Sequence, residues 1–245
     1  MATSKKKEVF PSVVSASPNK DFFVHMLTRD IELGDAILDL LDNCVDGIVR
    51  SPQKASSSRK PYQGYFANIS ISKSAFSISD NCGGIPLSLA KEKAFHLGRP
   101  PGHSDGVATV GMYGIGMKRA IFKMGLSCKV TSRNGNDAFA VTISENWLSD
   151  PEDWDLPIVE LPLKVAPNAG TTIEIQKLRP EVAKRFDESK DSFLEDFIEF
   201  VSQHYSVIIG KGFLVTINGT TVKEKPFRLL RYGLNNLPNP RDLAA

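Results

Sequence analysis

Apolar side chains recur at steps of three and four residues over residues 33–50, which is the clearest periodic pattern in the chain. This spacing places them along one stripe and predicts an amphipathic helix. The polar positions of this helix are almost all acids or amides. The same periodicity predicts a second long amphipathic helix over 186–207 and shorter helices over 20–30, 87–97 and 117–124.

Alternating apolar and polar residues predict a β-hairpin over 65–79 with one buried face. Further strands are expected at 127–133, 138–144, 157–163, 170–177 and 213–217. The last of these is followed by Asn218-Gly219, a strong signal for a hairpin turn. Residues 145–156 are expected to form an acidic loop, with Trp147 and Trp154 as packing anchors.

The composition is that of a globular protein, with 245 residues of which 41% are hydrophobic and 24% charged. This length suits one large domain, or one domain plus the start of a second. We expect a flexible arm over 1–19, the main domain over 20–225, and a linker or the start of a further domain over 226–245.

Thirty Lys and Arg residues against 28 Asp and Glu leave a net charge of +2. This near-balance argues against a whole-molecule clamp on nucleic acid or a membrane. Nucleic-acid contact through Lys5–Lys7 or Arg59-Lys60 is only weakly supported, the alternative being a solvated tail and loop. Three cysteines without a C-x-x-C pair predict neither a disulfide framework nor a cysteine zinc site. With no signal peptide or apolar span, we expect no membrane partner and a reducing, cytoplasmic location.

Polar side chains that suit a nucleotide are found at four places in the chain. Asp39, Asn43 and Asp46 are spaced i, i+4, i+7 and therefore share one helix face, for which a solvated acidic face is the plain alternative. Asp80 ends the predicted hairpin just before Gly83-Gly84. A carboxylate there can accept a hydrogen bond from an exocyclic amine while the glycines let a flat ring approach the backbone, although the segment alone is typical of a turn.

The third place is the glycine loop 111–116, which runs into a helix that carries Lys118. Backbone N–H groups at a helix N-terminus, with a nearby lysine, suit phosphate oxygens. The pattern is weak evidence alone, and no βαβ unit precedes it as a dinucleotide site would require. The fourth place is Gly170-Thr171, where a glycine opens a strand.

In this order, the four segments resemble the N, G1, G2 and G3 boxes of the GHKL ATPases, the superfamily of gyrase, heat-shock chaperone, histidine kinase and MutL ATP-binding domains. The resemblance covers roughly residues 20–220. Residues 36–47, AILDLLDNCVDG, are most similar to the microrchidia (MORC) type, whose N-box runs E-L-I-D-N-A-x-D-A. The implied fold is α/β (α+β), a two-layer Bergerat sandwich with a mixed sheet and helices on one face.

The resemblance also implies roles for individual residues. Asn43 would coordinate the Mg²⁺ that bridges the phosphates of ATP, Asp80 would recognise adenine, and Asp39 would be the general base. The lid glycines fall on Gly114 and Gly116, and the phosphate-contacting lysine on Lys118. The wider set expected to bind the nucleotide is Asn43, Asp46, Asp80, Gly84, Ile85, Gly114, Ile115, Gly116, Met117, Lys118 and Thr171.

Two positions depart from the pattern of the superfamily. Asp39 stands where glutamate is usual, so its carboxylate is one methylene shorter. General-base assistance is worth roughly 10²–10⁴ in rate, so this change predicts slow turnover or none. Cys82 stands where the usual D-x-G-x-G has its first glycine.

The sequence therefore predicts a domain that binds Mg-ATP and hydrolyses it slowly, with residues 98–113 as a lid and an ATP-dependent homodimer serving a further domain or partner. Arg99 and His103 in this lid are candidate phosphate contacts, with solvation as the alternative. The other hypotheses are a nucleotide-dependent interaction switch in which Asp39 no longer acts as base, and a protein kinase of the histidine-kinase or anti-sigma type.

Overall fold

A mixed β-sheet forms one layer of the computed structural model, which describes residues 19–50, 59–97, 115–135, 137–163, 169–187 and 192–225. Within these residues the sheet has eight strands, in the order β5-β4-β3-β6-β2-β1-β7-β8. The strands are β1 (Phe66–Ile71), β2 (Ala75–Asp80), β3 (Gly125–Asn134), β4 (Asp137–Ile143), β5 (Ile158–Glu160), β6 (Gly170–Leu178), β7 (Leu214–Ile217) and β8 (Thr220–Thr221). Strands β1 and β7 pair in parallel, and the other neighbours pair antiparallel.

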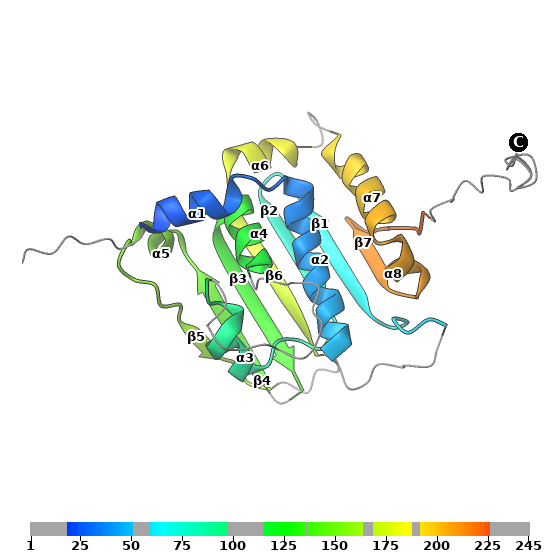
Figure 1. Ribbon diagram of the computed structural model, residues 1–245, viewed down its shortest axis with the longest axis horizontal. Helices are drawn as coiled ribbons and strands as arrows, with labels where there is room; N and C mark the ends of the chain where they lie inside the picture. The colour runs from blue at the N-terminus through cyan, green and yellow to red at the C-terminus, as the bar shows by residue number, and fades with distance from the viewer. Residues whose placement is uncertain are drawn as a thin grey trace, which may run out of the picture.

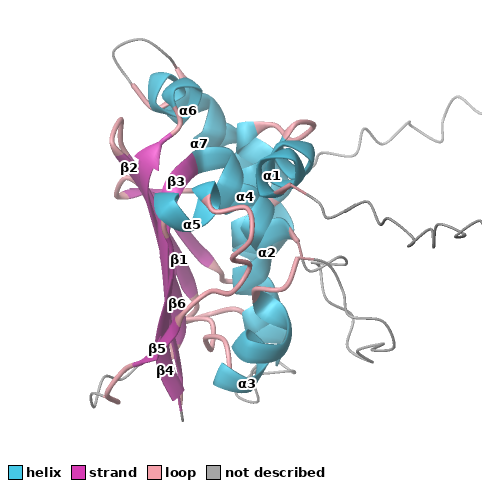
Figure 2. Cartoon of the chain, turned by 90° about the vertical axis from the view of Figure 1, so that its left-hand side faces the viewer, coloured by secondary structure: helices cyan, strands magenta, loops and turns pink. Residues whose placement is uncertain are grey.

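In the described part of the chain, the helices lie on one face of this sheet (Figures 1 and 2). They are α1 (Lys20–Thr28), α2 (Leu33–Arg50), α3 (Leu87–Leu89), the π-helix η1 (Ala90–Ala94), α4 (Gly116–Met124), α5 (Glu145–Ser149), α6 (Pro180–Arg185), α7 (Phe193–His204) and α8 (Ser206–Gly210). In Figure 1, α2 crosses the middle of the sheet, with α4 on one side and α7 on the other. The structure is thus the predicted α/β two-layer sandwich. Among the described residues, no helix is long and apolar enough to cross a membrane.

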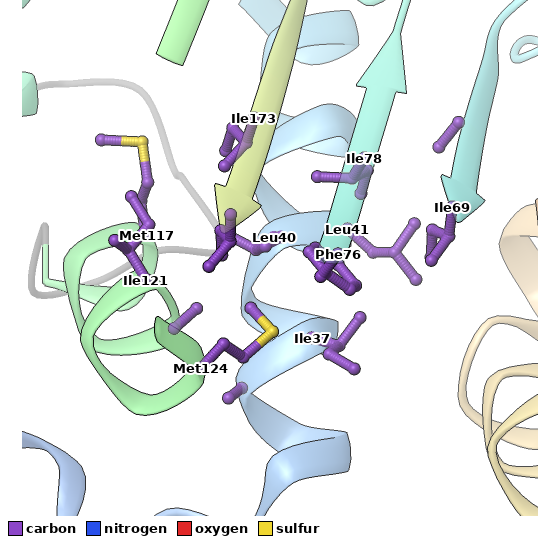
Figure 3. Packing of buried hydrophobic residues seen from close by; sticks show 14 of the residues in the cluster. Ile37, Leu40, Leu41, Ile69, Phe76, Ile78, Met117, Ile121, Met124 and Ile173 are labelled. Carbon is purple, nitrogen blue, oxygen red and sulfur yellow. The ribbon is translucent and has the colours of Figure 1, made fainter. Parts of the chain in front are cut away.

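The core lies between α2, α4 and the sheet (Figure 3). The apolar stripe of α2 packs against inward side chains of β1, β2 and β6, and the apolar side chains of α4 close the cluster from one side. Each large apolar side chain that is fully buried in this way contributes about 1.5–3 kcal/mol. This packing fixes the rotation of α2 about its axis. It therefore also fixes where the acidic and amide side chains of α2 point.

Most of the predicted elements are confirmed. The helix over 33–50 has the predicted bounds, and the hairpin, the helices near 20–30 and 117–124 and the five further strands lie within a few residues of their predicted positions. The predicted arm before Asn19 and the segment 226–245 lie outside the described residues. So does the segment 98–113, with Arg99 and His103.

The prediction that residues 145–156 are a loop is wrong at its start, where α5 forms. The side chain of Ser144 caps this helix by accepting a hydrogen bond from the N–H of Trp147. Trp147 is buried, as expected of a packing anchor, and its ring stacks on Phe122. The buried ammonium of Lys20 lies 3.9 Å from the Trp147 ring centroid and donates a hydrogen bond to its carbonyl, which ties α1 to α5.

The predicted helix over 186–207 is interrupted. Its predicted start is wrong, because α7 begins at Phe193. The buried ring of Phe186, just after the separate helix α6, packs against Phe76 and Phe193. Tyr205 ends α7 and separates it from α8, and its buried hydroxyl donates a hydrogen bond to Asp42 on α2. Burial raises the pKa of the Asp42 carboxyl. The predicted helix over 87–97 is present as α3 and η1 and ends at Ala94.

Candidate nucleotide-binding site

The carboxylate of Asp80, at the end of β2, is held by groups from three segments. Its Oδ1 accepts hydrogen bonds from the backbone N–H of Cys82 at 2.7 Å and of Thr171 at 3.3 Å. Its Oδ2 accepts a hydrogen bond from the Cys44 thiol of α2 at 3.6 Å. Burial raises the pKa of Asp80, and these hydrogen bonds oppose the rise. The hydrogen bond with Cys82, followed by burial, raises the pKa of the Cys44 thiol, so this thiol keeps the proton that it donates.

Three glycines allow the backbone to pack closely at Asp80 and at the loop that follows it. A Cβ atom on Gly170 would overlap the carbonyl oxygen of Asp80 and lie 2.8 Å from its carbonyl carbon. A Cβ atom on Gly84 would lie 2.6 Å from the carbonyl carbon of Arg133, and Gly84 also has a φ of +69°. A Cβ atom on Gly47, in α2, would overlap the carbonyl oxygen of Cys82. The loop after Asp80 is therefore enclosed by α2, β3 and β6.

The next residue of this loop, Ile85, is anchored to β3 through Ser132. The Ser132 hydroxyl accepts a hydrogen bond from the Ile85 N–H at 2.7 Å and lies 3.4 Å from the Ile85 carbonyl. Ser132 is fully buried at an inward position of β3. No role for Ser132 was predicted from the sequence. A signal was present, because the other inward positions of this strand bury apolar side chains and a buried hydroxyl needs a partner.

On the polar face of α2, the side chains of Asp39 and Asn43 differ in their hydrogen-bond partners. The Asp39 carboxylate lies against α4, where its Oδ2 accepts hydrogen bonds from Arg119. The Nδ2 group of Asn43 donates to the carbonyl of Asp39 at 2.7 Å, and its Oδ1 accepts nothing from the described residues. Asn43 is exposed, whereas Asp46, one turn later, is only 5% exposed. Of these three side chains, Asn43 is the exposed one, and its Oδ1 is open to a ligand.

These side chains would supply only a small part of the ligands of a bound Mg²⁺ ion. An amide oxygen is a suitable ligand for this hard cation. The described residues contain no group of three His, Cys, Asp or Glu side chains that could hold a metal ion. Mg²⁺ commonly takes one or two protein ligands and completes its shell with phosphate oxygens and water. Asn43 would then hold the ion together with the nucleotide.

The start of α4 supplies the other predicted groups. Ile115 precedes the helix, and Gly116 packs against Asp39, since a Cβ atom on it would lie 3.3 Å from the Asp39 Cγ. Met117 is buried in the core. Lys118 is 2% exposed and donates a hydrogen bond to the carbonyl of Ala94 at 2.9 Å. The predicted lid residue Gly114 lies outside the described residues.

Contacts thus connect the four sequence motifs around one side of α2. Cys44 and Gly47 join α2 to the loop after Asp80, and Thr171 joins the same loop to β6. Asp39 joins α2 to α4 through Gly116 and Arg119. A comparison with protein-family models matches residues 31–172, more than half of the chain, to the family described as histidine kinase-, DNA gyrase B-, and HSP90-like ATPase.

The chain belongs to this family. A search of curated proteins finds no match. Membership makes the matched region a GHKL-type ATP-binding domain, which agrees with the observed sandwich. The matched region begins just before α2 and ends just after Thr171, so it spans all four predicted motifs.

The departure at Cys82 lies against a glycine of α2. Cys82 stands where the resembled D-x-G-x-G motif has its first glycine, and Gly47 of α2 lies next to it. In this chain the helix carries the glycine and the loop carries the larger side chain, and the two are in contact. Cys82 is 1% exposed, with its thiol 3.7 Å from the Phe66 carbonyl. Its side chain therefore points into the core.

Lys118 leads to a prediction about pH. Burial lowers the pKa of Lys118 to about 8, so its free amine loses a proton as the pH rises through this value. If the charged form binds phosphate, ATP affinity should fall by up to about tenfold per pH unit above pH 8, because binding must then take up a proton. Titrations at pH 7, 8 and 9 measure this. Lys118→Arg stays charged and should flatten the profile, and the exposed Lys129→Arg should not. An equal pH dependence in Lys118→Arg would show that another group titrates.

Proposed function

We propose that this domain binds Mg-ATP and hydrolyses it slowly to ADP and phosphate. The observation that carries the proposal is the Asp80 carboxylate, which donors from α2, its own loop and β6 hold at the end of a strand. Gly170 packs against the backbone of Asp80, and Gly47 and Gly84 let α2 and β3 pack against the loop that follows it. Such a partly buried and oriented acceptor matches the need for a group that recognises the adenine amine.

The other groups follow from the same geometry. Mg²⁺ would be held by the Oδ1 of Asn43 and would neutralise charge on the phosphates when bound. The N-terminus of α4 directs backbone N–H groups toward the end of the helix where the glycine loop enters, and Lys118 lies within its first turn. Phosphoryl transfer to water depends mainly on positioning and on electrostatic stabilisation. These residues supply both.

Asp39 is the proposed general base. Its carboxylate lies between α2 and the first turn of α4, next to Gly116. It would accept a proton from water while the water oxygen bonds to the γ-phosphorus and the bond to ADP breaks. The short side chain is consistent with slow turnover, because a base must come within hydrogen-bond reach of its proton.

Nucleotide-dependent closure of a lid and dimerisation are part of the same proposal. They are supported by the position of α4, whose start contacts Asp39 and follows the glycine loop. The similarity of the N-box to the microrchidia type also supports them. Light scattering with a non-hydrolysable ATP analogue should then show a shift from monomer to dimer, and an unchanged mass would contradict this part.

A second candidate function is an interaction switch that binds ATP with little hydrolysis. One observation favours it: the Oδ2 of Asp39 is already occupied by Arg119. A base that keeps this partner has one oxygen left for water. Turnover measured beside binding separates the two functions, because a switch binds ATP whether or not Asp39 can accept a proton.

Asp80→Asn tests the nucleotide site itself. Asparagine keeps an Oδ1 acceptor for the two backbone N–H groups, but it places an NH₂ group where Oδ2 would accept the adenine amine. Loss of a hydrogen bond to a charged acceptor costs about 1.5–3 kcal/mol, so ATP affinity should fall roughly 10- to 100-fold. Isothermal titration in the presence of Mg²⁺ measures this. Glu174→Gln, an exposed change on β6, is the matched control, and equal affinities of the two variants would exclude Asp80 from the site.

A further inference from the structure

Arg119 contacts only one of the two carboxylate oxygens of Asp39. The Nη2 and Nε groups of Arg119 donate to the same oxygen, Oδ2, at 2.7 and 3.2 Å. The Oδ1 of Asp39 accepts no hydrogen bond from any residue that the structure describes. The Asp39 side chain is 24% exposed and that of Arg119 is 33% exposed, so both reach the surface of the site. One carboxylate oxygen is thus fixed and the other is open.

A second contact limits the movement of the same side chain. Gly116 lies against Asp39, and a Cβ atom at this position would come within 3.3 Å of Cγ and 3.5 Å of Oδ2. The backbone of Arg119 belongs to the first turn of α4, where its N–H donates to the carbonyl of Ile115 at 2.8 Å. Aspartate has only two rotatable side-chain bonds, and the side chain is held by Arg119 on one side and faces the backbone of Gly116 on the other.

We propose that Arg119 is a positioning residue for Asp39, holding Oδ2 so that Oδ1 is the oxygen presented to the attacking water. This inference rests on the proposed ATP hydrolysis. A partly exposed ion pair contributes little to stability, so the importance of this pair lies in orientation. Orientation matters strongly in catalysis, because a displacement of about 1 Å can cost about 100-fold in rate.

In the proposed hydrolysis, Arg119 orients the base and takes no part in making or breaking bonds. Water loses a proton to Oδ1 of Asp39, its oxygen bonds to the γ-phosphorus, and the bond from that phosphorus to the bridging oxygen of ADP breaks. Arg119 gains and loses no proton, since its guanidinium stays charged at all relevant pH values. Two donors that share one oxygen leave the basic lone pairs of the other oxygen available. The planar fork of arginine provides this geometry, and a lysine ammonium provides the charge without the fork.

The test measures turnover and binding separately in Arg119→Met and Arg119→Lys. We expect kcat for phosphate release to fall about 10- to 100-fold in Arg119→Met. The dissociation constant of a non-hydrolysable ATP analogue should stay within about threefold of wild type, because the proposal gives Arg119 no contact with the nucleotide. Arg119→Lys should recover part of the loss. Arg29→Met removes an exposed Arg–Asp pair elsewhere and is the matched control.

A double variant separates positioning from a general effect on the fold. If Arg119 acts only through Asp39, Asp39→Asn with Arg119→Met should turn over no more slowly than Asp39→Asn alone. A further fall in the double variant would overturn the inference. So would a weakened analogue affinity with unchanged kcat, which would make Arg119 a phosphate ligand instead.

The outcomes distinguish the inference from the proposed function. Wild-type kcat in Arg119→Met, combined with loss of turnover in Asp39→Asn, overturns the inference and leaves the ATPase in place. A wild-type protein that binds ATP without releasing phosphate overturns both, and then supports the interaction switch.

Discussion

Asp39→Asn should lower the rate of ATP hydrolysis by about 10²–10⁴ while leaving ATP affinity almost unchanged. Asparagine has nearly the same shape as aspartate, and its amide oxygen can still accept the hydrogen bonds of Arg119. The Gly116 contact also remains, because no atom is added. What disappears is the basic oxygen that would accept a proton from water. Phosphate release in a single turnover, followed beside an ATP-binding titration, measures the two properties independently.

Asp35→Asn is the matched control for this change. Asp35 lies one turn before Asp39 on α2 and is exposed, and it lines a different surface pocket between α2, α6 and α7. Its replacement removes the same charge from the same helix, so a rate that falls equally in both variants would indicate an electrostatic effect and not a base. Equal rates in wild type and Asp39→Asn would remove Asp39 from the mechanism.

The local pattern of the sequence was sufficient for elements that bury one face. The stripe on α2 and the alternation of β1 and β2 predicted their positions because the sheet and the helix layer meet along those residues. The failures have tertiary causes. Helix α5 depends on its cap by Ser144 and on the ammonium of Lys20 beneath Trp147, and Lys20 is far away in the sequence. Phe186, predicted to start a helix, lies outside α7, and its ring instead joins an aromatic cluster with Phe76 and Phe193.

The sequence predicted which segments form the candidate site, but it did not predict the contacts that join them. The order of motifs anticipated that Asp80 and Thr171 belong together, and the structure joins them by a hydrogen bond. Cys44 lies on the apolar stripe of α2 and was assigned to the core, so its bond to Asp80 had no sequence signal. Arg119 follows Lys118 directly, yet its partner Asp39 is 80 residues away. Such partners depend on the relative position of α2 and α4, which periodicity alone does not specify.

Gly170→Ala should cost about 2–4 kcal/mol of the free energy of unfolding and weaken ATP binding at least tenfold. The new Cβ atom would overlap the Asp80 carbonyl oxygen and lie 2.8 Å from the Asp80 carbonyl carbon and 3.0 Å from the Asn81 Cα. All three are backbone atoms, so no side chain can rotate away, and β6 must separate from the end of β2. That movement also displaces the Thr171 N–H from Oδ1 of Asp80. Urea unfolding and an ATP titration measure the two losses.

Gly135→Ala is the control that isolates this steric argument. Gly135 follows β3, a Cβ atom on it would meet nothing within 4 Å, and its φ is not in the left-handed region. The same added methyl group should therefore change stability by no more than about 0.5 kcal/mol and leave ATP binding intact. If Gly170→Ala unfolds at the same urea concentration as Gly135→Ala, the approach of β6 to Asp80 is looser than the structure shows. A normal unfolding midpoint with lost ATP affinity would instead mean that β6 moves at little cost, and that the position of Asp80 alone determines binding.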